Sequence, residues 1–178
     1  MKIQPSERLS YALMNHEDAD LFFELDQDPE VMRYINSGEI TTREMLNNVL
    51  IPRMESYRNE TEGWGIWKVL ITESQQFIGW ILVRPMNFFN KPEFDNLELG
   101  WRFFRKQWGK GYGTEAAKSI KKAIIDKGKA NKISAIAVEE NTASINIMKN
   151  LGMKYLKTGI HNDPLGAFEV VFYELTIS

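Results

Sequence analysis

The chain has 178 residues and a formal net charge of −2, with 43% hydrophobic and 26% charged residues. These values exclude a disordered or fibrous chain and favour a single globular domain over residues 1–178. Cysteine is absent and the two histidines, His16 and His161, are far apart, which excludes disulfides and cysteine nucleophiles and argues against a metal site.

The first half of the chain shows patterns typical of short helices and a β-hairpin. In chain order we predict a strand over 8–14, helices over 16–26, 29–35 and 41–57, and strands over 64–72 and 77–84. Pro52 lies inside the third helical pattern. It is therefore expected to bend or split that helix.

The second half begins with residues 85–95, which contain two prolines and three phenylalanines and are predicted to form a loop that contacts a ligand or partner. The next strand alternates in polarity, with Glu98, Gly100 and Arg102 on one face. We predict this strand over 97–103, a helix over 114–127, a strand over 132–138, a helix over 141–151 and strands over 155–160 and 167–177. The order indicates a mixed α/β fold.

The small net charge conceals an uneven distribution. Residues 1–101 hold 9 basic and 17 acidic side chains, whereas residues 102–132 hold 10 basic and 2 acidic ones. A basic segment in an acidic chain suggests an anionic partner, either a phosphorylated cofactor or a nucleic acid. A solvated helix face, formed by lysines such as Lys118 and Lys121, is the alternative.

A glycine-rich segment, QWGKGYGT at residues 107–114, joins the strand at 97–103 to the following helix. Its glycines let the backbone approach a ligand, and the amide groups at a helix start favour an anion such as a pyrophosphate. The segment lacks the Lys-Ser or Lys-Thr pair of a P-loop and the glycine spacing of a dinucleotide site. A tight turn without a ligand is the alternative.

Three segments, in this order, resemble the GNAT acetyltransferases: LELGWRF at 97–103, GKGYGTEA at 109–116 and ENTASINIMKNLGM at 140–153. The resemblance extends from Arg8 to Ile177, and the branch that it is most similar to includes ribosomal-protein N-terminal acetyltransferases. It implies a single GNAT-like α/β domain with a mixed, mostly antiparallel sheet of about seven strands, helices on both faces and two central parallel strands that splay apart.

The resemblance also implies an activity, the transfer of an acetyl group from acetyl-CoA to a primary amine by direct attack on the thioester. The amine would belong to a protein N-terminus or a small molecule. In such proteins the glycine loop wraps the pyrophosphate of coenzyme A, and the splayed strands hold pantetheine. The cofactor-binding residues implied here are Trp101, Arg102, Phe103, Trp108, Gly109, Lys110, Gly111, Tyr112, Gly113, Thr114, Asn141 and Ser144. Trp108 departs from the glutamine or arginine that the family prefers.

Glu98 is the candidate general base, because it lies on the strand that would flank the thioester and a carboxylate can accept the amine's proton directly or through water. A solvent-facing strand glutamate is the alternative. Asn141 and Ser144 have ordinary helix roles as alternatives, Asn141 as an N-cap. Met148 stands where many family members have a tyrosine that protonates the thiolate, and methionine cannot donate a proton.

A non-catalytic acyl-CoA-binding or regulatory module is the second hypothesis, and a nucleic-acid surface is the third. We expect no nucleic-acid partner, because the aromatic residues among the basic ones are explained by the strand and the loop. The charged N-terminal residues 1–10 and the absence of a long apolar run indicate a cytoplasmic protein without a membrane partner. Such a protein is expected to be a monomer or homodimer.

Overall fold

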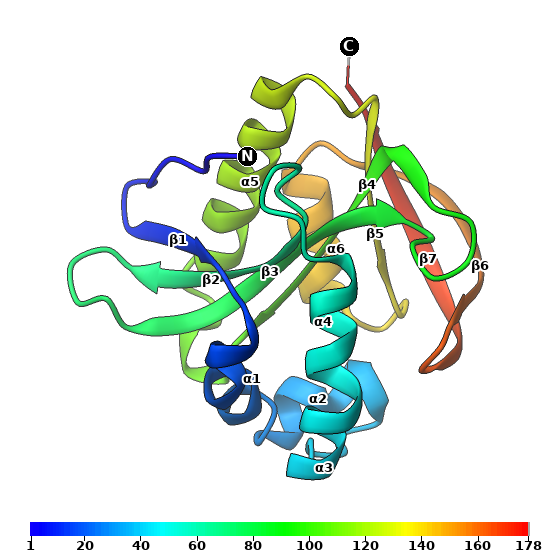
Figure 1. Cartoon of the computed structure of the whole chain (residues 1–178). Helices are drawn as coiled ribbons and strands as arrows, with labels where there is room; N and C mark the ends of the chain where they lie inside the picture. Colours follow the sequence, from blue (N-terminus) through cyan, green and yellow to red (C-terminus); the bar gives the residue numbers. More distant parts are fainter. Residues whose placement is uncertain (178) are drawn as a thin grey trace.

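The centre of the protein is one sheet of seven strands, seen in a computed structural model that describes residues 1–177 (Figure 1). The strand order is β1-β2-β3-β4-β5-β7-β6; β4 and β5 pair in parallel, and the other neighbours pair antiparallel. The expected mixed, mostly antiparallel sheet is therefore confirmed. Its strands are β1 (Leu9–Leu13), β2 (Gly65–Ile71), β3 (Phe77–Met86), β4 (Glu93–Phe103), β5 (Lys132–Ala137), β6 (Lys154–Asp163) and β7 (Gly166–Thr176).

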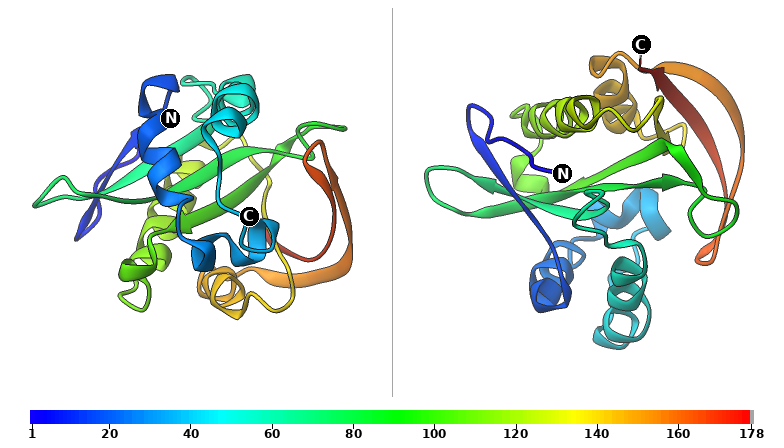
Figure 2. Two further views of the ribbon diagram at one scale, coloured as in Figure 1. Left: turned by 90° about the horizontal axis from the view of Figure 1, so that it is seen from below. Right: turned by 45° about the horizontal axis from the view of Figure 1, so that its top comes forward.

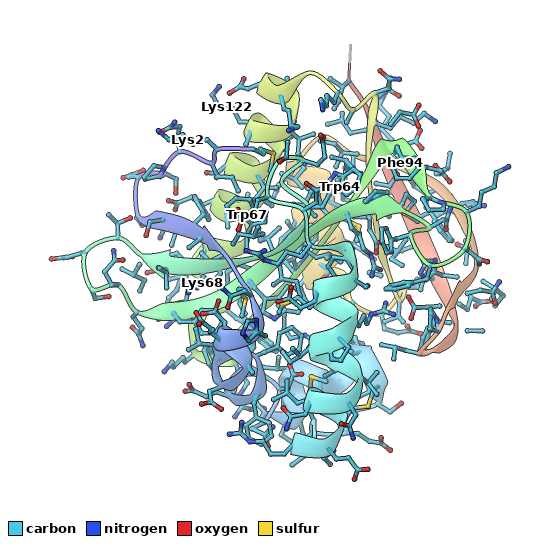
Figure 3. The ribbon with its side chains drawn as sticks, viewed as in Figure 1. Lys2, Trp64, Trp67, Lys68, Phe94 and Lys122 are labelled. Carbon is cyan, nitrogen blue, oxygen red and sulfur yellow. The ribbon has the colours of Figure 1, made fainter. Side chains whose placement is uncertain are left out.

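Helices cover both faces of the sheet, as the right view of Figure 2 shows. One face carries α5 (Tyr112–Lys127) and α6 (Thr142–Asn150); the other carries α1 (Ala19–Leu25), α2 (Pro29–Asn36), α3 (Arg43–Met45) and α4 (Ile51–Tyr57). The buried apolar side chains form two clusters, one with α5 and α6 and one with α1 to α4. The outer face of α5 is solvated, and Lys122 projects from it into solvent (Figure 3).

The helical segment that contains Pro52 widens directly before the proline. Between α3 and α4 lies a π-helical turn, Leu46–Leu50, in which the amide of Ile51 donates to the carbonyl of Leu46, five residues earlier. Because proline has no N–H and its ring crowds the carbonyl of the preceding turn, a regular α-helix is unfavourable here. The predicted bend or split is thus a wide turn followed by a new helical segment.

The prediction of a loop over residues 85–95 is wrong at both ends. β3 continues through Pro85 to Met86, and β4 begins at Glu93, so that only residues 87–92 lie between the two strands. The pairing of β3 with β4 shifts between Pro85 and Met86. Such an irregularity lets a strand contain proline, which cannot donate a ladder hydrogen bond.

The two parallel strands separate part-way along the sheet. β4 and β5 pair only from Asn96 to Glu98 on β4, opposite residues 132–134 of β5. Beyond Glu98, β4 continues beside β3 to Phe103, while β5 continues beside β7 to Ala137. The expected splay is therefore confirmed, and Glu98 lies at the point where it opens.

Candidate active site

The glycine loop turns the chain from β4 into α5 with left-handed backbone at two glycines. Gly109 has φ of 72° and Gly111 has φ of 79°, a conformation that other residues adopt at a cost. Gly111 is also the N-cap of α5 and supplies no side-chain hydrogen bond to the helix. Because the first amides of a helix have no partner within the helix, those at the start of α5 can bind an anion.

A cavity of about 340 Å³ extends from this loop along Trp101 to Phe103, the part of β4 beyond its pairing with β5. Four parts of the chain line it: β4, the glycine loop with the start of α5, the helix α6 with its cap, and the helix α2. Of the predicted cofactor residues, it brings together Trp101, Arg102, Phe103, Trp108, Gly109, Gly111, Tyr112, Gly113, Thr114, Asn141 and Ser144. The helix α2 contributes through Val31, Tyr34 and Ile35.

Lys110 does not line this cavity. Its Nζ donates to Gln107 Oε1 at 3.2 Å, and its carbonyl oxygen accepts a hydrogen bond from Arg8 Nη1 at 2.9 Å. The Arg8 guanidinium also lies 4.4 Å from the ring centre of Tyr112 and donates to Glu115 Oε2. Arg8 therefore fixes the loop from outside, a role that the sequence did not indicate because more than 100 residues separate the partners.

The carboxylate of Glu115 is held ionised by these contacts. Burial would raise its pKa, but hydrogen bonds from the Arg8 backbone, the Ser6 hydroxyl and the Arg8 guanidinium outweigh burial, so the pKa of Glu115 lies below its usual range. Arg8 in turn has a raised pKa, mainly through its hydrogen bond to Glu115. The ion pair ties the segment before β1 to the first turn of α5.

Two hydrogen bonds lie where β4 approaches the start of α6. Trp101 Nε1 donates to Ser144 Oγ at 3.2 Å, and the Ser144 amide donates to Asn141 Oδ1 at the same distance. Asn141 thus caps α6, as its alternative role predicted. Its amide NH₂ group is free of protein partners among residues 1–177.

If Asn141 also binds the cofactor, Asn141→Ala is expected to weaken coenzyme A binding up to about tenfold, the value of one net hydrogen bond. Loss of the cap alone costs about 1 kcal/mol of stability. Asn141→Ser keeps a cap acceptor without the amide and is the matched control. Isothermal titration with coenzyme A decides: unchanged affinity in both folded variants would leave Asn141 with the cap alone.

Glu98 is buried at the apex of the splay, with 5% of its surface exposed. The alternative of a solvent-facing strand glutamate is therefore wrong, because helices α1 to α4 cover this face of β4. Glu98 Oε2 accepts a hydrogen bond from Arg84 Nε at 2.8 Å, and the two residues are opposite each other in the β3–β4 pair. Arg84 is itself buried.

The Arg84 guanidinium lies among aromatic rings. Its carbon is 5.3 Å from the ring centres of both Tyr57 and Phe89. Burial alone would lower the pKa of Arg84, but the charge of Glu98 and the hydrogen bond to it, with smaller contributions from Tyr57 and Asp163, together outweigh burial and raise it. The pKa of Tyr57 is raised to about 12 by its burial, so Tyr57 is a neutral phenol at physiological pH.

A second arginine contacts the other side of Phe89. The Arg53 guanidinium is 4.2 Å from that ring centre, and Arg53 Nη2 donates to Asp163 Oδ2 at 2.6 Å. Burial would raise the pKa of Asp163, but the hydrogen bonds from Arg53 and the Leu165 amide and the charges of Arg53 and Arg84 together outweigh burial, so the pKa is lowered. The turn between β6 and β7 is thereby tied to α4, beside the face that carries Glu98.

The Arg102 side chain is committed to an ion pair. Arg102 Nη1 donates to Asp26 Oδ1 at 2.5 Å, and Asp26 also accepts from the Thr41 hydroxyl at 2.7 Å. The Arg102 guanidinium lies 4.9 Å from the ring centre of Trp80. A cofactor in the cavity would therefore meet the backbone of Arg102 more readily than its charge.

Several other basic side chains of residues 102–132 also form ion pairs with carboxylates. Beyond Arg102, four of its members pair with carboxylates of other segments: Arg105 with Asp28, Lys127 and Lys129 with Glu62, and Lys132 with Glu174. The anionic partner suggested by the sequence is thus left mainly with the glycine loop and the outer face of α5.

Met148 lies on the side of α6 that faces the core, with 1% of its surface exposed. It therefore packs against apolar residues and does not face the cavity. Across residues 1–177, no three histidine or carboxylate side chains are grouped as metal ligands are. In the same part of the chain, no helix has the length and hydropathy needed to span a membrane.

A family model described as an acetyltransferase (GNAT) domain matches residues 8–154. The chain belongs to the GNAT acetyltransferase family. As a member of this family it is an acyltransferase, and several of its relatives are named as N-acetyltransferases. The match ends at the first residue of β6, so β6 and β7 belong to the domain by their place in the sheet.

Named relatives and solved structures agree with this assignment. The Bacillus subtilis protein YkkB is 30% identical over 170 residues, 92% of each chain. The FsC-acetyl coenzyme A-N(2)-transacetylase of Aspergillus fumigatus is 27% identical over 164 residues, which cover 89% of this chain and 68% of that protein. A GNAT acetyltransferase from Bacillus anthracis has the same fold, with a TM-score of 0.77, 24% identity and coverage of 99% and 98%.

The fold also resembles that of RimL, a ribosomal L7/L12 α-N-protein acetyltransferase solved with coenzyme A. The TM-score is 0.75 at 11% identity, over 98% of this chain and 97% of that one. The likeness concerns the arrangement of helices and strands.

Proposed function

We propose that this chain is an acetyl-CoA-dependent N-acetyltransferase in which Glu98 is the general base. The single observation that carries the proposal is the continuous cavity from the uncapped start of α5 to the unpaired part of β4 at Trp101 to Phe103, on the same strand as Glu98. The cavity fits a long anionic cosubstrate, because its loop end offers free amides and positive-φ glycines, and its strand end offers apolar walls.

In this assignment the amides of the loop and of the first turn of α5 bind the pyrophosphate. The unpaired β4 edge at Trp101 to Phe103 offers backbone groups to pantetheine, since β5 has turned away there. Asn141 adds an amide donor at the start of α6. Acetyl-CoA supplies an acyl carbon that is already activated by its thioester.

The chemical step requires a neutral amine. A primary amine is protonated at neutral pH, so a base must take one proton before the nitrogen attacks. Glu98 accepts that proton, directly or through water; the amine nitrogen then forms the amide bond while the C–S bond breaks and the sulfur takes up a proton. The chain has no cysteine, which agrees with direct transfer.

Arg84 is the positioning residue for Glu98. Its guanidinium binds Oε2 at 2.8 Å, which holds the buried carboxylate in place and leaves Oε1 for the amine. The rings of Tyr57 and Phe89 hold the guanidinium in turn.

Acetyl-CoA is expected to raise the melting temperature of the protein, because a ligand that binds only the folded state stabilises it, by about 2.7 kcal/mol at 100 times its Kd. Gly111→Asp, which places a negative side chain on a left-handed residue of the loop, is expected to abolish the shift. Differential scanning calorimetry measures both.

Gly128→Asp is the matched control for this experiment. Gly128 is also left-handed, with φ of 67°, but lies at the opposite end of α5. It therefore carries the same strain and charge without contact to the cavity, and the shift should remain. A wild-type protein that does not respond to millimolar acetyl-CoA would refute the proposed cofactor.

A non-catalytic acyl-CoA-binding module is the second candidate function. The burial of Met148 favours it. Many family members have a tyrosine at this position that protonates the thiolate, whereas Met148 contributes no proton donor to the cavity. The two candidates differ in turnover: the module would bind acetyl-CoA and release no free coenzyme A with any amine.

A further inference from the structure

Four carboxylates on the α1-to-α4 side of the splay have arginine partners. Glu98 is paired with Arg84 at 2.8 Å, Asp163 with Arg53 at 2.6 Å, Asp26 with Arg102 at 2.5 Å and Asp28 with Arg105 at 3.1 Å. The first three pairs are largely buried, with side-chain exposures of 15% or less. These four pairs therefore add no net negative charge beside the splay.

The acidic residue in the cavity wall is compensated as well. Glu30, at the start of α2, lies 3.8 Å from Arg33 on the same helix. An acceptor with several ammonium groups would have to bury charges beside carboxylates that are already bound. Burying an ammonium group without its own partner is strongly unfavourable. If the ammonium group displaced an arginine from its carboxylate, the arginine would become the buried charge without a partner, at a similar cost in free energy.

The surface beside the Glu98–Arg84 pair is aromatic. Phe88 and Phe89 are half-buried, and their rings contact each other at 5.1 Å and Tyr57 at 5.8 and 6.2 Å. On the cavity side, α2 adds Tyr34 and Ile35, each more than one third exposed. Apolar substituents bind such walls through burial of their surface, with no need for a counter-charge.

We infer that the acceptor is a primary amine with one positive charge, carried on an apolar or aromatic body. This inference rests on the proposed function, since it takes Glu98 as the point where the amine loses its proton. The single charge meets Glu98, and the body of the molecule meets Phe88 and Phe89. A small aromatic amine and a peptide with an apolar first residue share this chemistry.

The test compares kcat/KM across an amine panel with acetyl-CoA. It uses 2-phenylethylamine, a hexapeptide that begins with Phe, the same peptide with Lys in first place, spermidine and kanamycin. For at least one of the first two amines, kcat/KM is expected to exceed the values for spermidine and kanamycin tenfold or more. Which of the two does so shows whether the acceptor is a small aromatic amine or a peptide. Equal or higher values for the polycations overturn the inference while leaving the proposed function intact; release of no coenzyme A with any amine overturns both.

Two variants probe the same surface. Phe89→Leu is expected to raise KM for the preferred amine about tenfold, with KM for acetyl-CoA within twofold of wild type. Arg53→Gln leaves Asp163 without its partner and is expected to shift the ratio of spermidine to monoamine turnover at least fivefold towards spermidine.

The control for Arg53→Gln is Arg43→Gln. Arg43 forms an exposed pair with Asp20 on the α1 and α3 helices, away from the cavity walls, and its loss should not change the ratio. If both folded arginine variants keep the wild-type ratio and Phe89→Leu keeps the wild-type KM, the arginine pairs and the aromatic rings do not select the acceptor, and the inference is refuted.

Discussion

Replacement of Glu98 by glutamine is expected to lower the turnover number about 10²-fold or more, the range typical of a lost general base. Glutamine retains the shape of the side chain and can still accept a hydrogen bond from Arg84 through its carbonyl oxygen. It cannot accept the proton of an ammonium group at neutral pH. Affinity for acetyl-CoA should stay near wild type, because Glu98 does not line the cofactor cavity.

The pH dependence separates this role from a structural one. In the wild type, activity should rise with pH as the base and the amine lose protons. In Glu98→Gln the remaining rise should follow the amine alone. Glu93→Gln, on the exposed start of the same strand, is the matched control and should leave turnover unchanged. A folded Glu98→Gln enzyme with turnover within about twofold of wild type would show that another group accepts the proton.

Arg84→Gln is expected to produce the second largest effect, a fall in kcat/KM at neutral pH that is partly recovered in alkaline solution. The charge of Glu98 raises the pKa of Arg84 against the effect of burial. By the same coupling, the charge of Arg84 favours the ionised form of Glu98. Without it, the buried carboxylate retains its proton to higher pH, so the acid limb of the pH profile moves upward.

The direction of this shift is the decisive readout. A loss of activity that is equal at all pH values would show that Arg84 only supports the fold. Arg84→Lys keeps the positive charge and should keep the position of the acid limb even if turnover falls. Because removal of one partner from a buried ion pair costs about 3–5 kcal/mol, the Arg84→Gln, Glu98→Gln double variant, a neutral pair, serves to show that the fold tolerates the change.

The sequence predicted the elements with the strongest patterns. The hairpin of β2 and β3, the alternating strand β4 and the glycine loop were all recognisable from local residue order, because strand alternation and positive-φ turns are local properties. The loop predicted over residues 85–95 was wrong because a register shift at Pro85 lets β3 continue, and such shifts depend on the neighbouring strand.

The surroundings of Glu98 were the part that the sequence did not predict. Alternation places Glu98 on the face opposite Leu97 and Leu99, but it does not tell whether helices cover that face. The partners Arg84, Arg53 and Asp163 come from three separate segments, and only the β3–β4 register and the turn of β6 and β7 bring them together. An arginine within the apolar run FIGWILVRPM was the available signal of a buried ion pair.

The central claim, acetyl transfer from acetyl-CoA to an amine at Glu98, is tested most directly by measuring free coenzyme A and N-acetylated product in the same reaction over the amine panel. The predicted result is one acetylated amine for each coenzyme A released, at a rate that falls about 10²-fold in Glu98→Gln. Saturable binding of acetyl-CoA with no release of coenzyme A beyond its spontaneous hydrolysis, for every amine in the panel, would contradict the claim and identify the chain as an acyl-CoA-binding module.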